Sequence, residues 1–375
     1  VSGYSNSFGE LGLGTTGSQE TGTKVGTSSW SQVSVGIGYS LGIRSDGALF
    51  AWGLNSYGQL GTGDTNNYSS PVQIGTSSWS QVSAGQYHTT AIRSDGLLFV
   101  WGSNSYGGLG NNTAYYTQYS SPVQLGTASW SQVATPGNND GTLAIRSDGL
   151  LFAWGENNYG QLGTGNNYAS NMVQVGVGTS SWAKIYAGSQ MTFGVTVTGA
   201  LFAWGTNTYG GLGTGDTTTY YSPVQIGVSS SWSQISTDSD FSAAISSNGN
   251  LYTWGDNQYG ELGLNSVGNV TAFTSPIQVG TSSWSQISTG SSFAMGVLTN
   301  GTLYAWGNFS SGQYSLNPAQ FSSPTNSWIL NGSSGNYGSG LWMIRGDNKL
   351  YGTNQSIFTP DTQSISNITL ISSQS

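Results

Sequence analysis

The side chains that most often perform catalysis are scarce in this chain of 375 residues. It contains one histidine, His88, no cysteine, and 15 aspartates and glutamates. Nucleophilic catalysis needs a base next to the nucleophile, and common zinc sites need several histidine or cysteine ligands. We therefore expect a non-enzymatic protein with no catalytic residue, no cofactor and no metal centre.

The carboxylates do not form a recognisable acid–base pair. Glu10, Glu156 and Glu261 are far apart in the sequence, so their spacing predicts no catalytic couple. Asp64 and Asp216 each follow Gly-Thr-Gly in a polar loop, where calcium binding is one interpretation and turn capping the other. Calcium prefers several converging carboxylates, so one aspartate per loop favours turn capping.

Composition excludes two classes of partner. Only 6% of residues are charged, and the formal net charge is −8. The chain has seven basic residues, and four of them occupy one repeat position: Arg44, Arg93, Arg146 and Arg345. Such spacing predicts no basic stripe for phosphate contacts, so we expect no nucleic-acid partner. The sequence also lacks a run of about 18 apolar residues, so we expect no membrane insertion.

A segment of about fifty residues recurs along the whole chain. Its clearest form runs from Trp52 to Gly61 and combines Trp-Gly, Asn, Tyr and a Gly-x-Leu-Gly turn. The Trp-Gly pair recurs at Trp52, Trp101, Trp154, Trp204, Trp254 and Trp306, and a second tryptophan series begins the units at Trp30, Trp79, Trp130, Trp182, Trp232, Trp284 and Trp328. Repeats of this length stack on their neighbours to bury a common core. We expect the six Trp-Gly tryptophans to be structural.

The unit that begins at Trp79 reads as four short strands. Residues 78–83 alternate apolar and polar side chains, residues 90–93 form a second strand, and residues 97–102 form a third after a Ser-Asp-Gly turn. Asp-Gly suits a tight hairpin because glycine adopts positive φ freely. Residues 121–126 form the fourth strand, which opens with proline. His88 occupies a position that holds Tyr39, Met191, Phe241 or Phe293 in other units, so we interpret it as a packing residue.

Four antiparallel strands per unit without helical periodicity predict an all-β propeller. Units that begin near residues 30, 79, 130, 182, 232, 284 and 328 predict seven four-stranded blades in one domain spanning 1–375. Residues 1–29 carry a Gly-x-Leu-Gly turn with no blade before it, and the last blade lacks that turn. We therefore expect residues 1–29 to complete the last blade and close the ring, while the role of residues 355–375 stays open.

The motif resembles a known family. Trp52 to Gly61, together with Gly85 to Thr89, resembles the regulator of chromosome condensation repeat, a seven-bladed propeller family. The resemblance covers nearly the whole chain and implies the fold rather than one activity, since its members include a guanine-nucleotide exchange factor, a photoreceptor, ubiquitin-ligase domains and secreted inhibitors. The chain lacks the basic tail of the exchange factor, and no catalytic domain is appended.

The loops between the Gly-x-Leu-Gly turn and the following Ser-Pro-Val-Gln carry the contact candidates. Their tyrosines stand among Ser, Thr, Asn and Gly, a composition typical of antibody loops. Aromatic residues three positions before the proline recur, so packing explains them. Tyr115, Tyr116 and Tyr221 fall outside that register, so we expect them to contact a partner.

The sequence therefore predicts a binding or structural module rather than an enzyme. Low charge and polar repeats favour adhesion or protein recognition on a virion, a cell surface or a secreted assembly, with a protein or surface glycan of a host or a neighbouring assembly subunit as partner. One alternative is an intracellular regulator similar to a small-GTPase exchange factor. Another is a carbohydrate-binding module that uses the loop tyrosines as sugar platforms.

Overall fold

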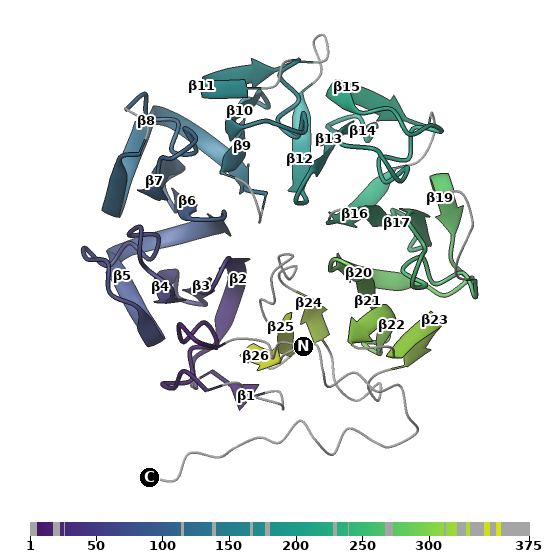
Figure 1. The fold of residues 1–375 in the computed structure, drawn as a ribbon, viewed down its shortest axis with the longest axis horizontal. Coiled ribbons are helices and arrows are strands. Elements are labelled where there is room, and N and C mark those ends of the chain that lie inside the picture. Colours follow the sequence, from purple (N-terminus) through teal and green to yellow (C-terminus); the bar gives the residue numbers. More distant parts are fainter. Residues whose placement is uncertain are drawn as a thin grey trace.

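A computed structural model gives the fold as an all-β arrangement of antiparallel strands around a central axis (Figure 1). The structure describes residues 6–17, 23–25, 27–113, 116–136, 140–165, 168–176, 181–227, 231–238, 240–266, 273–310, 313–320, 328–330, 341–345 and 350–353. Tyr115 and the tail at residues 355–375 lie outside these ranges. No helix in the described ranges is long and apolar enough to span a membrane.

The first three units share one ten-stranded sheet, β2 to β11. Its strands are β2 (Trp30–Gly36), β3 (Tyr39–Arg44), β4 (Ala48–Gly53), β5 (Tyr68–Ala84), β6 (His88–Arg93), β7 (Leu97–Ser103), β8 (Gln118–Ala134), β9 (Gly141–Arg146), β10 (Leu151–Glu156) and β11 (Tyr168–Val175).

The remaining strands form four-stranded sheets. These are β12 (Trp182–Ala187), β13 (Met191–Thr196), β14 (Leu201–Gly205) and β15 (Tyr220–Ile226); β16 (Trp232–Thr237), β17 (Phe241–Ser246), β18 (Leu251–Gly255) and β19 (Phe273–Gln278); β20 (Trp284–Thr289), β21 (Phe293–Leu298), β22 (Leu303–Ser310) and β23 (Gln313–Gln320); and β1 (Thr23–Lys24) with β24 (Trp328–Leu330), β25 (Leu341–Arg345) and β26 (Leu350–Thr353).

The ten-stranded sheet arises because β5 and β8 each continue from one unit into the next. Residues 68–78 of β5 pair with β4, and residues 79–84 pair with β6. The repeat pattern predicts separate strands at 121–126 and near 130, but a single strand of 17 residues, β8, covers both. Because the polar linker between the two halves keeps an extended backbone, the outer strand of one unit becomes the inner strand of its neighbour.

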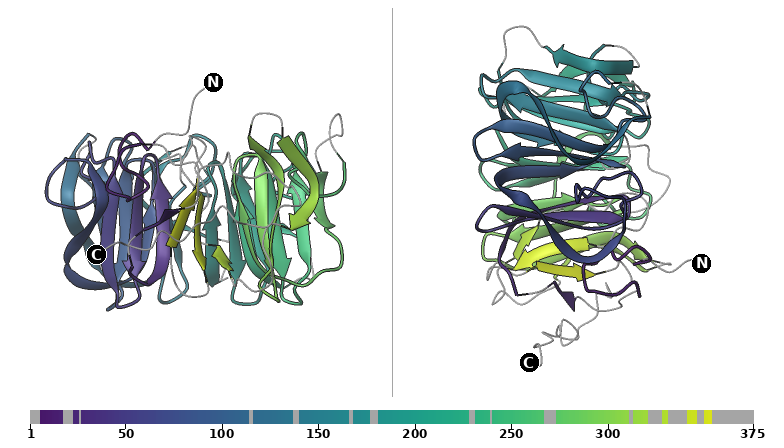
Figure 2. Two further views of the ribbon diagram at one scale, coloured as in Figure 1. Left: turned by 90° about the horizontal axis from the view of Figure 1, so that it is seen from below. Right: turned by 90° about the vertical axis from the view of Figure 1, so that its left-hand side faces the viewer.

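The two ends of the chain meet in one sheet. β1 pairs antiparallel with β26, where Thr23 lies opposite Gly352 and Lys24 opposite Tyr351. Figure 2 shows the remaining sheets side by side around the axis, with their strands running between the two faces of the molecule. Each unit therefore presents one set of turns on one face and a second set on the other.

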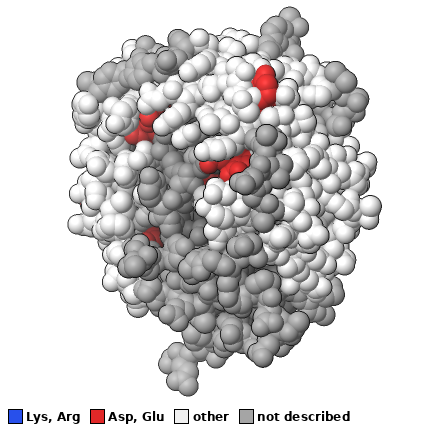
Figure 3. All heavy atoms as spheres, turned by 45° about the vertical axis from the view of Figure 1, so that its right-hand side comes forward, with Lys and Arg blue, Asp and Glu red and all other residues white. Residues whose placement is uncertain are grey.

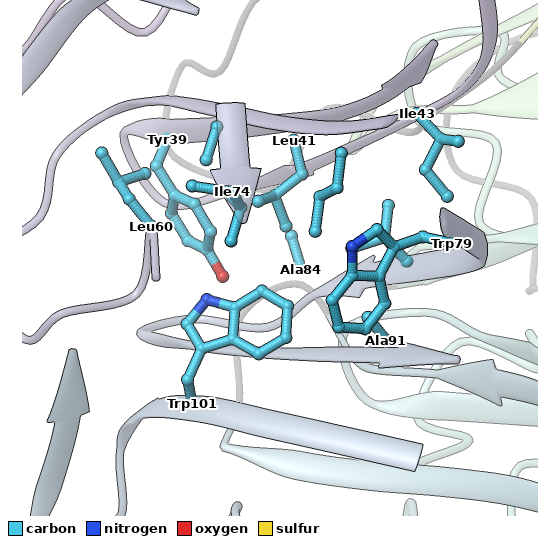
Figure 4. Close-up of a cluster of buried hydrophobic side chains, with 12 residues drawn as sticks. Tyr39, Leu41, Ile43, Leu60, Ile74, Trp79, Ala84, Ala91 and Trp101 are labelled. Atoms are coloured by element: carbon cyan, nitrogen blue, oxygen red, sulfur yellow. The ribbon is translucent and has the colours of Figure 1, made fainter. Parts of the chain in front are cut away.

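The hydrophobic core lies between neighbouring units. Tyr39 and Leu41 of β3 pack with Trp79 of β5 and Trp101 of β7, all at most 5% exposed (Figure 4). Trp79 also meets Trp101 edge to face, with ring centroids 6.0 Å apart. Buried aromatic pairs in this geometry add to the burial free energy. Neither unit buries these side chains alone, so stacking of the units creates the core.

Each Trp-Gly tryptophan also joins two units through a hydrogen bond. The indole Nε1 of Trp101 donates to the carbonyl of Gln59, which lies in the Gly-x-Leu-Gly turn of the preceding unit, at 2.9 Å. Gly61 of that turn has φ +79°, and a Cβ there would lie 2.7 Å from the Trp101 Nε1. Glycine is required for the close approach. The equivalent bonds run from Trp52 to Glu10, Trp154 to Gly108, Trp204 to Gln161, Trp254 to Gly211 and Trp306 to Glu261.

Glutamine side chains link the innermost strands, which are not paired as a sheet. The Gln132 amide donates to the Ile185 carbonyl and accepts from the Ile185 N–H. Gln32 and Gln234 make the same pair of bonds to Val82 and Ile287. Lys184 replaces glutamine in β12, and its Nζ donates to the Ser233 carbonyl at 2.9 Å. At the three seams with Gln32, Gln132 and Gln234, one side-chain amide thus satisfies both backbone groups of the neighbouring strand.

Candidate protein-binding face

The strand order places two kinds of turn on opposite faces. On one face lie the short turns between the first and second strands of each unit and the long loops that follow each Trp-Gly pair. We call it the carboxylate face. On the other lie the Ser-Asp-Gly hairpins and the connections between units, and we call it the arginine face. Backbone bonds from Ser45 to Ser29 and from Ser94 to Ser78 hold each hairpin against such a connection.

Acidic residues gather on the carboxylate face. Its turns and loops hold nine of the 15 acidic residues of the chain: Glu10, Asp64, Asp140, Glu156, Asp216, Asp238, Asp240, Asp256 and Glu261. The same turns and loops contain no lysine or arginine in the sequence. Figure 3 shows red carboxylate patches and no blue atoms on the side in view. The face is therefore negatively charged without cations of its own.

Burial and neighbouring charges disfavour ionisation of several of these carboxyl groups. Burial, the largest cause, and the charges of Asp256 and Asp240 together raise the pKa of Glu261 to about 7. Burial also raises the pKa of Asp240, with the charge of Asp256 as second cause. Burial raises the pKa of Glu156, to which the nearby Asp140 adds. These groups lie close enough to repel one another.

The arginine face balances its charges locally. Arg44 donates to both oxygens of Asp46, with an Nη2–Oδ2 distance of 2.6 Å. Its guanidinium lies over the Phe50 ring at 5.0 Å from the centroid. Arg93 and Arg146 repeat this arrangement with Asp95 and Phe99 and with Asp148 and Phe152. Each of these three hairpins carries a bidentate ion pair, so it offers little net charge to a partner.

A circle of half-exposed aromatic rings surrounds the carboxylate face. Every Gly-x-Leu-Gly turn is preceded by one aromatic residue: Phe8, Tyr57, Tyr106, Tyr159, Tyr209 and Tyr259, all 38–49% exposed. We call these residues the aromatic circle. In the sequence they belong to the repeat motif and were not predicted to contact a partner. Their exposure could have been predicted from their position next to a turn glycine, where an aromatic side chain has little room to point into the core.

The predicted contact residues lie on this same face. Tyr116 is 84% exposed and has φ 64°, and Tyr221 is 36% exposed. A Cβ on Gly160 would lie 2.8 Å from Cδ1 of Tyr221, so Tyr221 packs beside the turn that carries Tyr159. Tyr115 lies outside the described residues. Tyr221 therefore lies beside a member of the aromatic circle, and Tyr116 lies exposed in a loop of the same face.

The residues expected to be structural are enclosed. Trp52, Trp101, Trp154, Trp204, Trp254 and Trp306 are all fully buried. His88 is also fully buried; its Nε2 lies 2.8 Å from Oγ1 of Thr142, and its Nδ1 lies 3.3 Å from Oδ1 of Asp140. Thr142 donates its hydroxyl hydrogen to the Gly108 carbonyl, so it accepts from His88 Nε2. The contact between His88 Nδ1 and Asp140 Oδ1 joins side chains of two neighbouring units.

Turn capping accounts for the aspartates of the long loops. Asp64 Oδ1 accepts from Oγ1 of Thr62, and its Oδ2 accepts from the hydroxyl of Tyr68 at 2.7 Å. These bonds, that from Tyr68 first, hold the pKa of Asp64 at about 2. Asp216 has the equivalent bonds with Thr214 and Tyr220. Within the described ranges no group of three or more His, Asp or Glu side chains is arranged to hold a metal ion.

A polar cavity of about 200 Å³ lies at the centre of the molecule, between the innermost strands. Gln32, Ser83, Gln132 and Tyr186 are among the residues that line it, with Asp238 on the side of the carboxylate face. Gln32, Ser83 and Gln132 already bond neighbouring strands, as in the 2.7 Å contact between Ser83 and Thr135. The cavity lining is therefore occupied mainly with joining the units.

Comparison with protein families identifies the repeat. The model of the regulator of chromosome condensation (RCC1) repeat matches residues 46–92, 95–138, 148–195, 198–245 and 248–297, and a second model of the same repeat matches five further overlapping segments between residues 30 and 313. The chain belongs to the regulator of chromosome condensation repeat family. A comparison with curated protein sequences found no match.

Solved structures share the fold at low sequence identity. Human WBSCR16 is 19% identical over 89% of both chains, with a TM-score of 0.72. Yeast RCC1 (Prp20), solved bound to Kap60, is 20% identical over 86% of this chain and 80% of its own, with a TM-score of 0.71. Prp20p from Saccharomyces cerevisiae, described with its binding properties to Gsp1p and histones, is 19% identical over 86% and 82%, with a TM-score of 0.69. At this identity the likeness establishes the fold.

Proposed function

We propose that the chain is a non-enzymatic protein-binding propeller that meets its partner with the carboxylate face. The contrast between the two faces carries the proposal. The arginine face balances its aspartates with arginines, whereas the carboxylate face combines carboxylates that have no cations of their own with the aromatic circle. Exposed aromatic side chains are frequent anchors at protein interfaces. Binding of Kap60, Gsp1p and histones by similar propellers supports a protein partner.

Site-specific photo-crosslinking tests the proposal. A photo-reactive amino acid replaces Tyr116 or Tyr209 on the carboxylate face, and Val197, which is 66% exposed on the arginine face, serves as the matched control. We expect discrete protein adducts from extracts of the source cell or its host at the two tyrosine positions and none at residue 197. Equal adducts from both faces, or none from the tyrosines, would contradict a partner site on the carboxylate face.

A second candidate function is nucleotide exchange on a small GTPase. It is favoured by the shared fold with Prp20 and by the negative face, which would attract a basic surface of such a partner. Release of labelled GDP from small GTPases decides it. Acceleration by the purified chain supports exchange, whereas crosslinking to a partner without accelerated release leaves protein binding alone.

An adhesive role outside the cytoplasm is a further proposal, and it rests on composition. Low charge and a surface rich in Ser, Thr, Asn and Gly fit a virion, a cell surface or a secreted assembly, with a protein or surface glycan as partner. Fractionation of the source cells and particles tests this localisation. Recovery only from the cytoplasm would contradict it.

We propose further that the chain is one domain of seven blades closed by its N-terminal segment. The pairing of β1 with β26 and the bond from Trp52 Nε1 to Glu10 support closure, because Glu10 supplies the turn that five other units receive from their predecessors. Deleting residues 6–25 removes both contacts and exposes a sheet edge. The melting temperature should fall clearly, and an unchanged value would contradict closure by this segment.

A further inference from the structure

The carboxylate face leaves negative charge uncompensated. Burial and the charge of Asp256 raise the pKa of Asp240, and burial with the charges of Asp256 and Asp240 raises that of Glu261. The loops at 54–67, 103–117, 156–167, 206–219 and 256–272 contain no lysine or arginine. The described arginines that form ion pairs all lie on the arginine face. Lys184 Nζ donates to the Ser233 carbonyl on an inner strand. None of the described lysine and arginine side chains is paired with these groups, so a cation supplied by another molecule would balance them.

A buried polar atom points to the same conclusion. Asp140 is 1% exposed, and its Oδ1 faces His88. Its Oδ2 has no hydrogen-bond partner among the described residues. The charge of Asp140 also contributes to the raised pKa of Glu156, at the start of the next loop. A buried carboxylate oxygen without a donor is costly, and a cation that binds beside Glu156 would reduce the cost.

The aromatic circle adds a second means of binding cations. Tyr209 and Tyr259 precede the turns on either side of the unit that carries Asp240 and Asp256, and Tyr259 lies two residues before Glu261. Ammonium and guanidinium groups are attracted to aromatic ring faces within about 6 Å. The arginine face shows the chain using this contact internally, since Arg44 lies over Phe50 at 5.0 Å.

We propose that the partner presents a lysine- and arginine-rich segment to the carboxylate face. This rests on the proposed function and names the chemistry of its partner. The carboxylates form separate groups, Asp140 with Glu156 and Asp240 with Asp256 and Glu261, so several cations on one chain can be bound at once. Such multiple contacts on a flexible segment give affinity that no single surface ion pair provides.

A neutral glycan accounts for fewer of the observations. Tyrosine rings would stack on a sugar, but a sugar brings no positive charge to Asp240, Asp256 or Glu261. Nucleic acid carries the wrong charge for this face. The uncompensated carboxylates thus favour a cationic protein segment over either alternative.

Fluorescence anisotropy with a short labelled peptide rich in lysine and arginine tests the proposal. The test variant carries Asp240→Gln and Asp256→Thr, the residues that the preceding unit has at these positions, Gln190 and Thr206. The matched control carries Asp46→Asn and Asp95→Asn and changes the net charge equally on the arginine face. We expect the peptide to bind at low salt and the test variant to lose about tenfold or more in affinity, while the control loses less than about twofold.

Further arms separate the remaining outcomes. A peptide of the same length with glutamate in place of the basic residues should not bind, and melting curves check that each variant folds. Absence of peptide binding, equal losses in both double variants, or binding of an oligosaccharide in place of the peptide would overturn the cationic partner. If adducts at Tyr116 persist while the peptide does not bind, the protein-binding face stands and its partner is not cationic. If both fail, the proposed function fails as well.

Discussion

The two faces of this propeller use the same acidic side chains for different purposes. On the arginine face, Asp46 follows an arginine by two residues and is bound by it through three hydrogen bonds. On the carboxylate face, burial raises the pKa values of Asp240 and Glu261, and the charged neighbours that raise them further are other acids. Asp46 is part of the repeated hairpin, whereas Asp240 occupies a position where the repeat does not require an acid.

The sister units make this difference visible within one chain. The hairpin aspartate recurs with its arginine at Asp46, Asp95 and Asp148. The position of Asp240 instead holds Gly38, Tyr87, Asp140, Gln190 or Ser292 in other units, identified by the same backbone bond across the turn. A side chain that the fold does not demand at its position is a better candidate for function.

The largest expected effect concerns the core that holds both faces in place. Trp154 is fully buried and donates to Gly108 of the preceding unit, so Trp154→Ala removes burial and an inter-unit bond together. Unfolding free energy should fall by about 3–5 kcal/mol, as for other buried tryptophans. Denaturant melts measure it. A variant of unchanged stability that has lost only partner binding would show that Trp154 serves the carboxylate face and not the core.

The next largest effect concerns Asp140, an acid of the carboxylate face that contacts His88. His88→Phe introduces the residue type that stands at the equivalent positions of two other units, as Phe241 and Phe293. It also leaves Asp140 without its hydrogen-bond partner. Leaving a buried polar group without its partner costs about 1–3 kcal/mol.

The double variant His88→Phe with Asp140→Ser provides the control, because Phe241 and Ser292 form this combination in another pair of units. It should recover most of the lost stability in the same denaturant melts. A double variant as unstable as the single one would show that the histidine ring itself, and not the coupling to Asp140, holds the seam.

Much of this architecture could be predicted from the sequence, because the same motif occurs at the same position in several units. Trp52 and its sister tryptophans, the Ser-Asp-Gly hairpins and the apolar third strands each recur at one position, and the family match agrees with them. The coupling of His88 to Asp140 could not be predicted, since it joins residues 52 positions apart in different units. The aromatic circle was missed because a periodic tyrosine reads as packing, and only the turn geometry leaves Tyr57 and Tyr209 half exposed.

A smaller effect tests the repulsion on the carboxylate face. Glu261 stands where Gln59 and Gln161 stand in other units, and its Oε2 accepts from the Tyr259 N–H as Oε1 of Gln59 does from Tyr57. Because its pKa is raised from 4.5 to about 7, the unfolded carboxyl ionises first as the pH rises. Its contribution to the free energy of unfolding therefore decreases as the pH rises from 4.5 to 7.

Glu261→Gln should remove this loss. The variant should be more stable than the unchanged chain above pH 7, by on the order of 1–2 kcal/mol, and the gain should vanish toward pH 4.5. Thermal melts across this pH range measure it. A gain that is constant with pH would point to better packing of the amide and not to relief of charge.

The smallest effect belongs to the arginine face. Hydrogen bonds from Arg44, the largest cause, lower the pKa of Asp46 to about 2, so this carboxylate contributes stability above its unfolded pKa of 3.8 and loses the contribution as the pH falls toward 2. The pair is exposed, and exposed ion pairs contribute little because water and salt screen them. Asp46→Asn should therefore melt almost as the unchanged chain does at pH 7, in contrast to the gain from Glu261→Gln at the same pH. A clear loss at pH 7 would mean that the hairpin ion pairs hold the units together, and the arginine face would then be as structural as the core beneath it.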